Sequence, residues 1–146
     1  MVPSSCVLNM IRSVHRHLET RLGAVYRLCF MEREDLTGLT KWIEPHWLRI
    51  GPGIASVSVL QLSLFSVVSE DPYLTDLRKM HDEVMEEMNV DSIPMYDFEA
   101  QGGPVPLWVP VIPRYRGTER VPGKADSVEG LAMTYEVRVW REDVLA

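Results

Sequence analysis

The sequence contains little cysteine and no long apolar run. Its two cysteines, Cys6 and Cys29, are too few for a disulfide-stabilised scaffold, which predicts thiols in a reducing environment. No apolar stretch reaches the roughly 18–20 residues that a membrane-spanning helix needs. The N-terminus lacks a basic region followed by an apolar core, so we expect no secretory signal and a soluble, intracellular chain.

Positive charge is also scarce. The chain has 15 Lys and Arg against 21 Asp and Glu, a net charge of −6, and no basic cluster. This balance argues against a free-standing nucleic-acid-binding protein. The length of 146 residues and the hydrophobic fraction of 46% predict one globular domain over residues 1–146 with a substantial core.

Motifs for catalysis and for ligand binding are missing. His15 and His17 are two positions apart on a predicted helix, which points them to different sides, so we expect surface residues rather than a metal pair. His81 shares a helix face with methionines rather than with a carboxylate cluster. Gly102 and Gly103 lack the context of a phosphate-binding loop. We therefore predict no catalytic residue, no metal site and no cofactor.

The central feature of the sequence is a long apolar stretch followed directly by an amphipathic one. Ala55–Val68 has only Ser and Gln as polar residues and predicts a strand paired on both edges. Its apolar phase switches face near Val59–Leu60, which predicts a bulge or burial of both faces. Asp71 as N-cap and Pro72 in the first turn then predict an amphipathic helix that continues to Met88.

The chain before this pair is predicted to contain a helix and an edge strand. Apolar residues at steps of three and four from Val7 to Val25 predict a helix with one buried stripe, which Gly23 ends or loosens, with a continuation through Arg27 as the alternative. Val25–Met31 fits either a last helical turn or a short strand. Trp42–Ile50 is predicted to be extended, and Pro45 assigns it to a sheet edge or divides it into two short pieces.

The remainder is predicted to be all strand and loop. Ile93–Phe98 and Leu107–Tyr115 are predicted strands, and the two prolines of the second limit its pairing to one side or to its ends. Arg116–Gly130 is predicted to be a long polar loop. Leu131–Trp140 alternates apolar and polar residues and predicts a strand with one core face. The expected fold is α+β, in the order α-β-β-α-β-β-β, with two helices on one side of a mostly antiparallel sheet.

Tryptophans in edge and loop segments indicate a domain that self-associates, because tryptophan is enriched at protein–protein contacts. The candidate interface residues are Trp42, Trp47, Trp108 and Trp140. Acidic residues on the second helix form a possible acidic interface or channel wall, with a solvated helix face as the alternative. These residues are Asp82, Glu83, Glu86 and Glu87.

In this layout the chain resembles the tail terminator (tail completion) proteins of tailed bacteriophages, over about Val7 to Asp143. The segments that carry the resemblance are VLNMIRSVHRHLETRL, KWIEPHWLRI, VLQLSLFSVVSED, LTDLRKMHDEVMEEM, IPMYDF, VPVIPRYRG and GLAMTYEVRVWRED. The resemblance implies a structural virion protein rather than an enzyme. It also implies a homo-oligomeric ring, commonly hexameric, that binds the last ring of tail tube protein, ends its polymerisation and docks to the head–tail connector.

The same resemblance implies that DNA passes through the ring without being read, that no membrane is involved, and that the protein resides in the virion tail or neck after assembly in the host cytoplasm. One alternative is another neck or head–tail joining protein of the same architecture. A second is a small α+β ligand-binding or enzymatic domain, for which His46, Asp97 and Arg114 are the only candidate residues.

Overall fold

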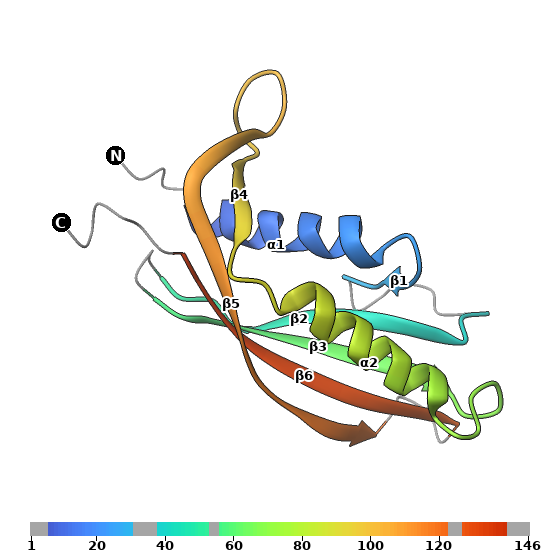
Figure 1. Cartoon of the computed structure of the whole chain (residues 1–146). Coiled ribbons are helices and arrows are strands. Elements are labelled where there is room, and N and C mark those ends of the chain that lie inside the picture. The colour runs from blue at the N-terminus through green and yellow to red at the C-terminus, as the bar shows by residue number, and fades with distance from the viewer. Residues whose placement is uncertain (1–5, 31–37, 53–55, 123–126, 140–146) are drawn as a thin grey trace.

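A curled six-stranded sheet holds two helices against one of its faces (Figure 1). The computed structural model describes residues 6–30, 38–52, 56–122 and 127–139. The elements are α1 (Cys6–Leu22), β1 (Arg27–Leu28), β2 (Lys41–Arg49), β3 (Ser58–Val67), α2 (Thr75–Met88), β4 (Ile93–Asp97), β5 (Val105–Pro122) and β6 (Val128–Val139). The strand order across the sheet is β1-β2-β3-β6-β5-β4.

The α+β class and the placement of both helices on one side are confirmed, but the predicted element order lacks one strand. β1 lies in the segment that fitted either a helical turn or a strand, and it pairs in parallel with β2. The other neighbouring strands are antiparallel, so the sheet is mixed. A strand of two residues is too short to show a hydrophobic period, so the sequence could not identify β1. It is a strand because it pairs with β2.

α1 ends as its sequence predicts. The Gly23 N–H donates to the carbonyls of Leu18 and Glu19 at 3.2 and 3.0 Å. A Cβ at Gly23 would lie 2.5 Å from the Glu19 oxygen, so this close approach requires glycine. The thiols of Cys6 and Cys29 are both buried, in two different clusters of the core.

β3 is the centre of the core. Leu60, Leu62 and Leu64 point to the helices and are fully buried. The predicted irregularity near Val59 is present, but the extra residue is in the partner strand, where Leu48 of β2 has no opposite residue in β3. On the other face, Phe65 belongs to a second, smaller cluster with Trp42 and Cys29.

α2 begins later than predicted. Leu74, not Asp71, is the N-cap, with a left-handed φ of 55°. Asp71 still caps the helix, because its carboxylate accepts hydrogen bonds from the N–H groups of Asp76 and Leu77, both at 3.0 Å. An intervening turn, closed by Leu74 N–H donating to the Asp71 carbonyl, displaces the helix start by one turn.

The predicted loop over residues 116–130 is wrong at both ends, because β5 extends into it and β6 begins at Val128 rather than Leu131. β5 continues to Pro122 after a bulge between Tyr115 and Gly117, where Gly117 has a φ of 152°. β6 pairs with this extension and buries Met133, Tyr135, Val137 and Val139 on its core face, as its alternation predicts. Within the described ranges, no helix is both long and apolar enough to cross a membrane.

Candidate interaction surface

The tryptophans predicted to form an interface have different environments. Trp42 is 4% exposed, stacks on Phe65 with ring centroids 5.5 Å apart, and donates its indole N–H to Glu44 Oε2 over 2.7 Å. It is a core residue, so its assignment to an interface is wrong for this conformation. Trp140 and the side chain of Trp108 lie outside the described residues.

Trp47 is half-buried and joins β2 to α1. Its indole Nε1–H donates to Nε2 of His15 over 3.0 Å, and His15 also contacts Phe30 at a centroid distance of 4.5 Å. Burial lowers the pKa of His15, which keeps the ring neutral and able to accept this bond. His15 is therefore not the surface residue that the sequence predicts.

Two of the four acidic residues predicted as an interface, Glu83 and Glu87, lie beside α1 or the turn that follows it. The Glu87 carboxylate lies 3.9 Å from Nε of Arg21, and the Glu87 carbonyl accepts a hydrogen bond from His17 Nε2 over 2.7 Å. Burial, together with a hydrogen bond to Glu83, raises the pKa of the Tyr26 hydroxyl far above its ordinary value. Both glutamates thus attach α2 to the C-terminal end of α1.

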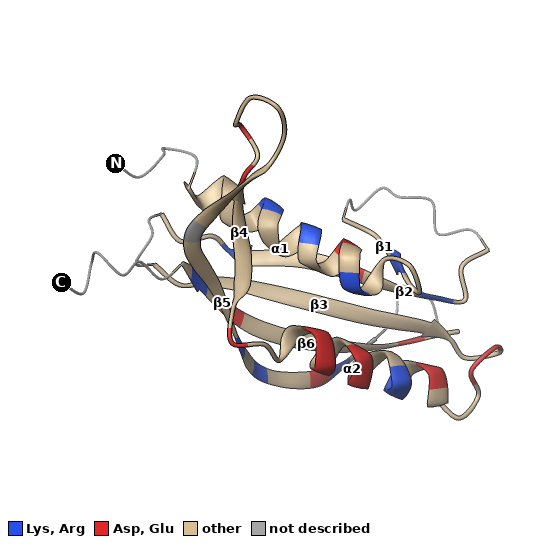
Figure 2. Cartoon of the chain, turned by 45° about the horizontal axis from the view of Figure 1, so that its top comes forward, with Lys and Arg blue, Asp and Glu red and all other residues tan. Residues whose placement is uncertain are grey.

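Asp82 and Glu86 lie elsewhere on the same helix. Asp82 is on the opposite flank, with Oδ1 3.3 Å from Nδ1 of its neighbour His81, and Glu86 is exposed between the two flanks. Because residues three and four apart share a helix face, Glu86 links Asp82 to Glu83, and the four acidic residues occupy one continuous arc of α2 whose margins have different neighbours. In Figure 2 the ribbon positions of acidic residues predominate along α2 and those of basic residues along α1.

The three residues considered for an enzymatic site lie on different strands. His46 is on β2, beside Glu44 at 3.4 Å, whereas Arg114 is on β5, and β3 and β6 lie between these strands. Asp97 ends β4 and receives a hydrogen bond from Asn9 of α1 at 3.5 Å. The structure does not bring the three together. Among the described residues, no group of three or more His, Cys, Asp or Glu side chains could hold a metal ion.

A polar chain that the sequence did not predict crosses from α2 to β5. His81 Nε2 lies 3.0 Å from Thr118 Oγ1, which lies 2.5 Å from the Tyr115 hydroxyl. Two hollows of about 290 and 390 Å³ follow this α2–β5 seam, the second lined by Met85 and Tyr135. His81 and Thr118 are 37 positions apart in the sequence, so no local motif indicates their contact.

The backbone N–H and C=O groups of each strand residue point to one neighbouring strand or the other. The Ile43 carbonyl accepts a hydrogen bond from the Cys29 N–H at 2.8 Å, so the backbone polar groups of Ile43 face β1. The Val67 N–H donates to the carbonyl of Thr40, which directly precedes β2. The Val68 N–H donates to the carbonyl of Ser127, which directly precedes β6. Because polar groups alternate sides along a strand, these bonds and the observed register assign a side to every strand residue from β2 to β5.

This assignment shows that β5 has a free edge. β4 pairs with β5 only as far as Val111, and no described residue pairs with the same side of β5 beyond it. Thr118 and Arg120 lie opposite β6 residues that face β3, so their N–H and C=O groups point away from β6. Pro113 and Pro122 face the same free side, where a missing N–H costs no ladder bond.

A second free edge lies at the other end of the sheet. β1 covers only Trp42 and Ile43, so within the described residues the polar groups of Pro45 and Trp47 face an unoccupied side of β2. Pro45 thus occupies an edge, as predicted. Leu48 is 58% exposed beside this edge.

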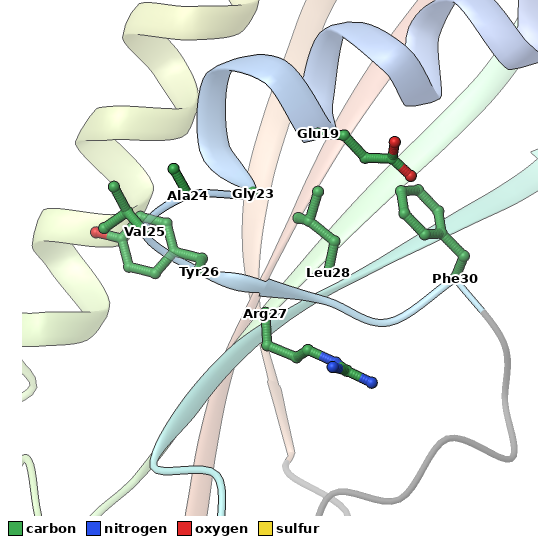
Figure 3. A pocket seen from close by; sticks show the side chains of 8 residues that line it. All are labelled: Glu19, Gly23, Ala24, Val25, Tyr26, Arg27, Leu28 and Phe30. Atoms are coloured by element: carbon green, nitrogen blue, oxygen red, sulfur yellow. The ribbon is translucent and has the colours of Figure 1, made fainter.

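An open groove of about 540 Å³ lies at the same end, between the C-terminal turn of α1 and β1 (Figure 3). Val25 is 63% exposed on its rim, while Leu28 and Phe30 form its apolar floor and Glu19 and Arg27 its charged margins. The groove is thus a hollow of the α1–β1 connection, and no β2 residue lines it.

The edge of β4, in contrast, is closed by α1. The Tyr96 N–H donates to Ser13 Oγ at 2.9 Å, and the Phe98 N–H donates to Asn9 Oδ1 at 3.2 Å. Both α1 side chains are buried, so these donors are satisfied within the chain. Within the described residues, α1 therefore closes this edge, while those of β5 and β2 have no partner.

Comparison with known proteins gives no assignment, since no protein-family model and no curated protein matches the sequence significantly.

Proposed function

We propose that this chain is a structural protein of a tailed-phage virion that forms a hexameric ring on the end of the tail tube. The ring ends tube polymerisation and joins the tail to the head connector, and DNA passes through its lumen without sequence-specific contacts. The proposal rests on the layout of elements described above and on one structural observation, the two free edges at opposite ends of one sheet.

Two different surfaces at opposite ends are what a ring needs. A head-to-tail contact joins one surface of a subunit to a different surface of the next, and closes when the rotation between copies divides a full circle. The free edges of β5 and β2 form such a pair. Each has an exposed large hydrophobic side chain beside it, Tyr115 at 39% and Leu48 at 58%, which pairing with another copy would remove from solvent.

The charge of the chain is compatible with this role. Each copy has a net charge of −6, and a ring of such copies repels DNA phosphates instead of retaining the passing duplex. Arg21 and Glu87 hold the two helices together within a copy, which leaves the rest of the helical layer to face tube or connector.

The test is the mass and shape of the purified protein. We expect light scattering after size exclusion, over a range of concentrations, to give the mass of a hexamer, and electron microscopy to show rings. Tails assembled without the protein should vary in length, and added protein should restore one length. A strict monomer at every concentration, together with unchanged tail length, would contradict the proposal. A ring that binds connector but not tube would instead indicate another neck protein.

A further inference from the structure

We propose that the subunits join by strand addition, with the free edge of β5 in one copy pairing antiparallel with the free edge of β2 in the next. This inference rests on the proposed ring and names its interface. The occupant of each edge is therefore a second copy of this chain, and the sheet continues from subunit to subunit.

The strand directions permit this junction. β3, β6 and β5 alternate in direction, and β2 is antiparallel to β3, so β5 runs opposite to β2. Copies related by rotation about an axis close to the strand direction keep these directions. β5 of one copy then meets β2 of the next in antiparallel orientation, the more stable arrangement per residue.

One register pairs backbone groups of both edges, although the Arg120 carbonyl gains no donor because Pro45 opposite it lacks an N–H. Trp47 and Thr118 both direct their N–H and C=O groups outward, so placing them opposite each other lets them exchange two hydrogen bonds. Arg120 N–H then donates to the carbonyl of Pro45. On the outer face of the sheet, His46 comes opposite Glu119, a pair of compatible charge.

The alternative pairing of β5 with itself joins two copies by a two-fold contact and leaves the β2 edge of each copy uncovered, so it does not build a ring. Charge discriminates little between the two pairings, because Arg116 and Arg120 each form an ion pair with a glutamate of β6. The β2 edge contributes a single arginine, Arg49, and the exposed Leu48, which loses solvent contact when β5 pairs there.

Disulfide trapping tests this register directly. Directly opposite residues of a non-hydrogen-bonded antiparallel pair have Cα atoms about 4.5 Å apart, within disulfide range. His46→Cys combined with Glu119→Cys should therefore give a ladder of cross-linked multimers up to the ring size under oxidising conditions. Each single variant, the matched control, should give no ladder, since the native cysteines are buried.

Backbone substitution tests the edge itself. Arg120→Pro and Arg120→Ala both lose the Arg120–Glu129 ion pair at 2.9 Å, but only the proline variant also lacks the outward backbone N–H. We expect the proline variant to lose the oligomer while its thermal unfolding stays cooperative, and the alanine variant to keep the oligomer. Glu119→Pro, which removes a ladder bond to β6, should instead lower thermal stability.

The outcomes separate this inference from the proposed function. An oligomer that persists in Arg120→Pro, with no ladder in the double-cysteine variant, overturns the β5–β2 interface and leaves the ring intact. A wild-type chain that is monomeric at all concentrations overturns both.

Discussion

Trp47 donates its indole N–H to Nε2 of His15, and this bond is possible only while the imidazole is neutral. Burial holds the pKa of His15 below 6.5 in the folded chain. Below pH 6.5 the unfolded chain therefore binds a proton at this site that the folded chain does not. The contribution of His15 to the free energy of unfolding thus has its full value above pH 6.5 and decreases as the pH falls.

This relationship predicts how His15→Gln behaves. Glutamine can accept the indole N–H but does not titrate, so the variant should lose less stability than the wild type between pH 7.5 and about 5. Urea unfolding at several pH values measures the difference. Identical pH profiles for the two proteins would show that His15 is not the titrating group.

Removing the hydroxyl of Ser13 should destabilise the chain without altering its surface. Ser13→Ala leaves the Tyr96 N–H without its acceptor at a site that is 1% exposed, and an unsatisfied buried donor costs about 1–3 kcal/mol. Thr20→Ala, at an exposed position of the same helix, is the control and should change the free energy of unfolding by less than about 0.5 kcal/mol.

Asp71 should matter for α2 although it is not the N-cap. Asp71→Ala removes two hydrogen bonds to helix N–H groups and should cost about 1–2 kcal/mol in urea unfolding. Burial acts to raise the Asp71 pKa, but hydrogen bonds from Asp76 and Leu77 hold it below 3.8. The carboxylate therefore makes its full contribution to the free energy of unfolding above pH 3.8. This contribution is lost as the pH falls through the folded-state pKa of Asp71. A variant with wild-type stability at pH 7 would contradict this role.

Gly130 is predicted to tolerate no larger residue. A Cβ there would lie 2.7 Å from the ring of Phe65 on the adjacent strand, and this ring is held by Trp42. Gly130→Ala should cost about 1–3 kcal/mol through overpacking. Adding Phe65→Leu should make the combined loss smaller than the sum of the two single losses, because the substitutions relieve the same clash. Additive losses in thermal unfolding would exclude the clash as the cause.

Predictability differed between elements for a physical reason. α1, α2 and β6 have hydrophobic periods that define their type and buried face locally, and the structure confirms them. The long extension of β5 beyond Tyr115 has a polar sequence with Gly117 in it, and it is a strand only because β6 supplies its ladder. Periodicity does not report a partner far along the chain.

The same holds for the candidate surface. Pro45 and Pro113 mark their strands as restricted in pairing, and this was readable from the sequence. Which side of each strand is free could be assigned only from the register of four paired strands. The burial of Trp42 and the hydrogen bond from His81 to Thr118 likewise depend on segments that meet only after folding.

The sequence by itself determined the α+β class, the buried stripe of each helix and the core face of the last strand, because composition and short-range period are local properties. Only the tertiary structure decided that Glu87 lies beside Arg21 of α1, that Trp42 is core, and that β5 and β2 keep free edges within the described residues. Each of those depends on which distant segments pair or pack, and a hydrogen-bonded ladder has no existence until both of its strands are in place.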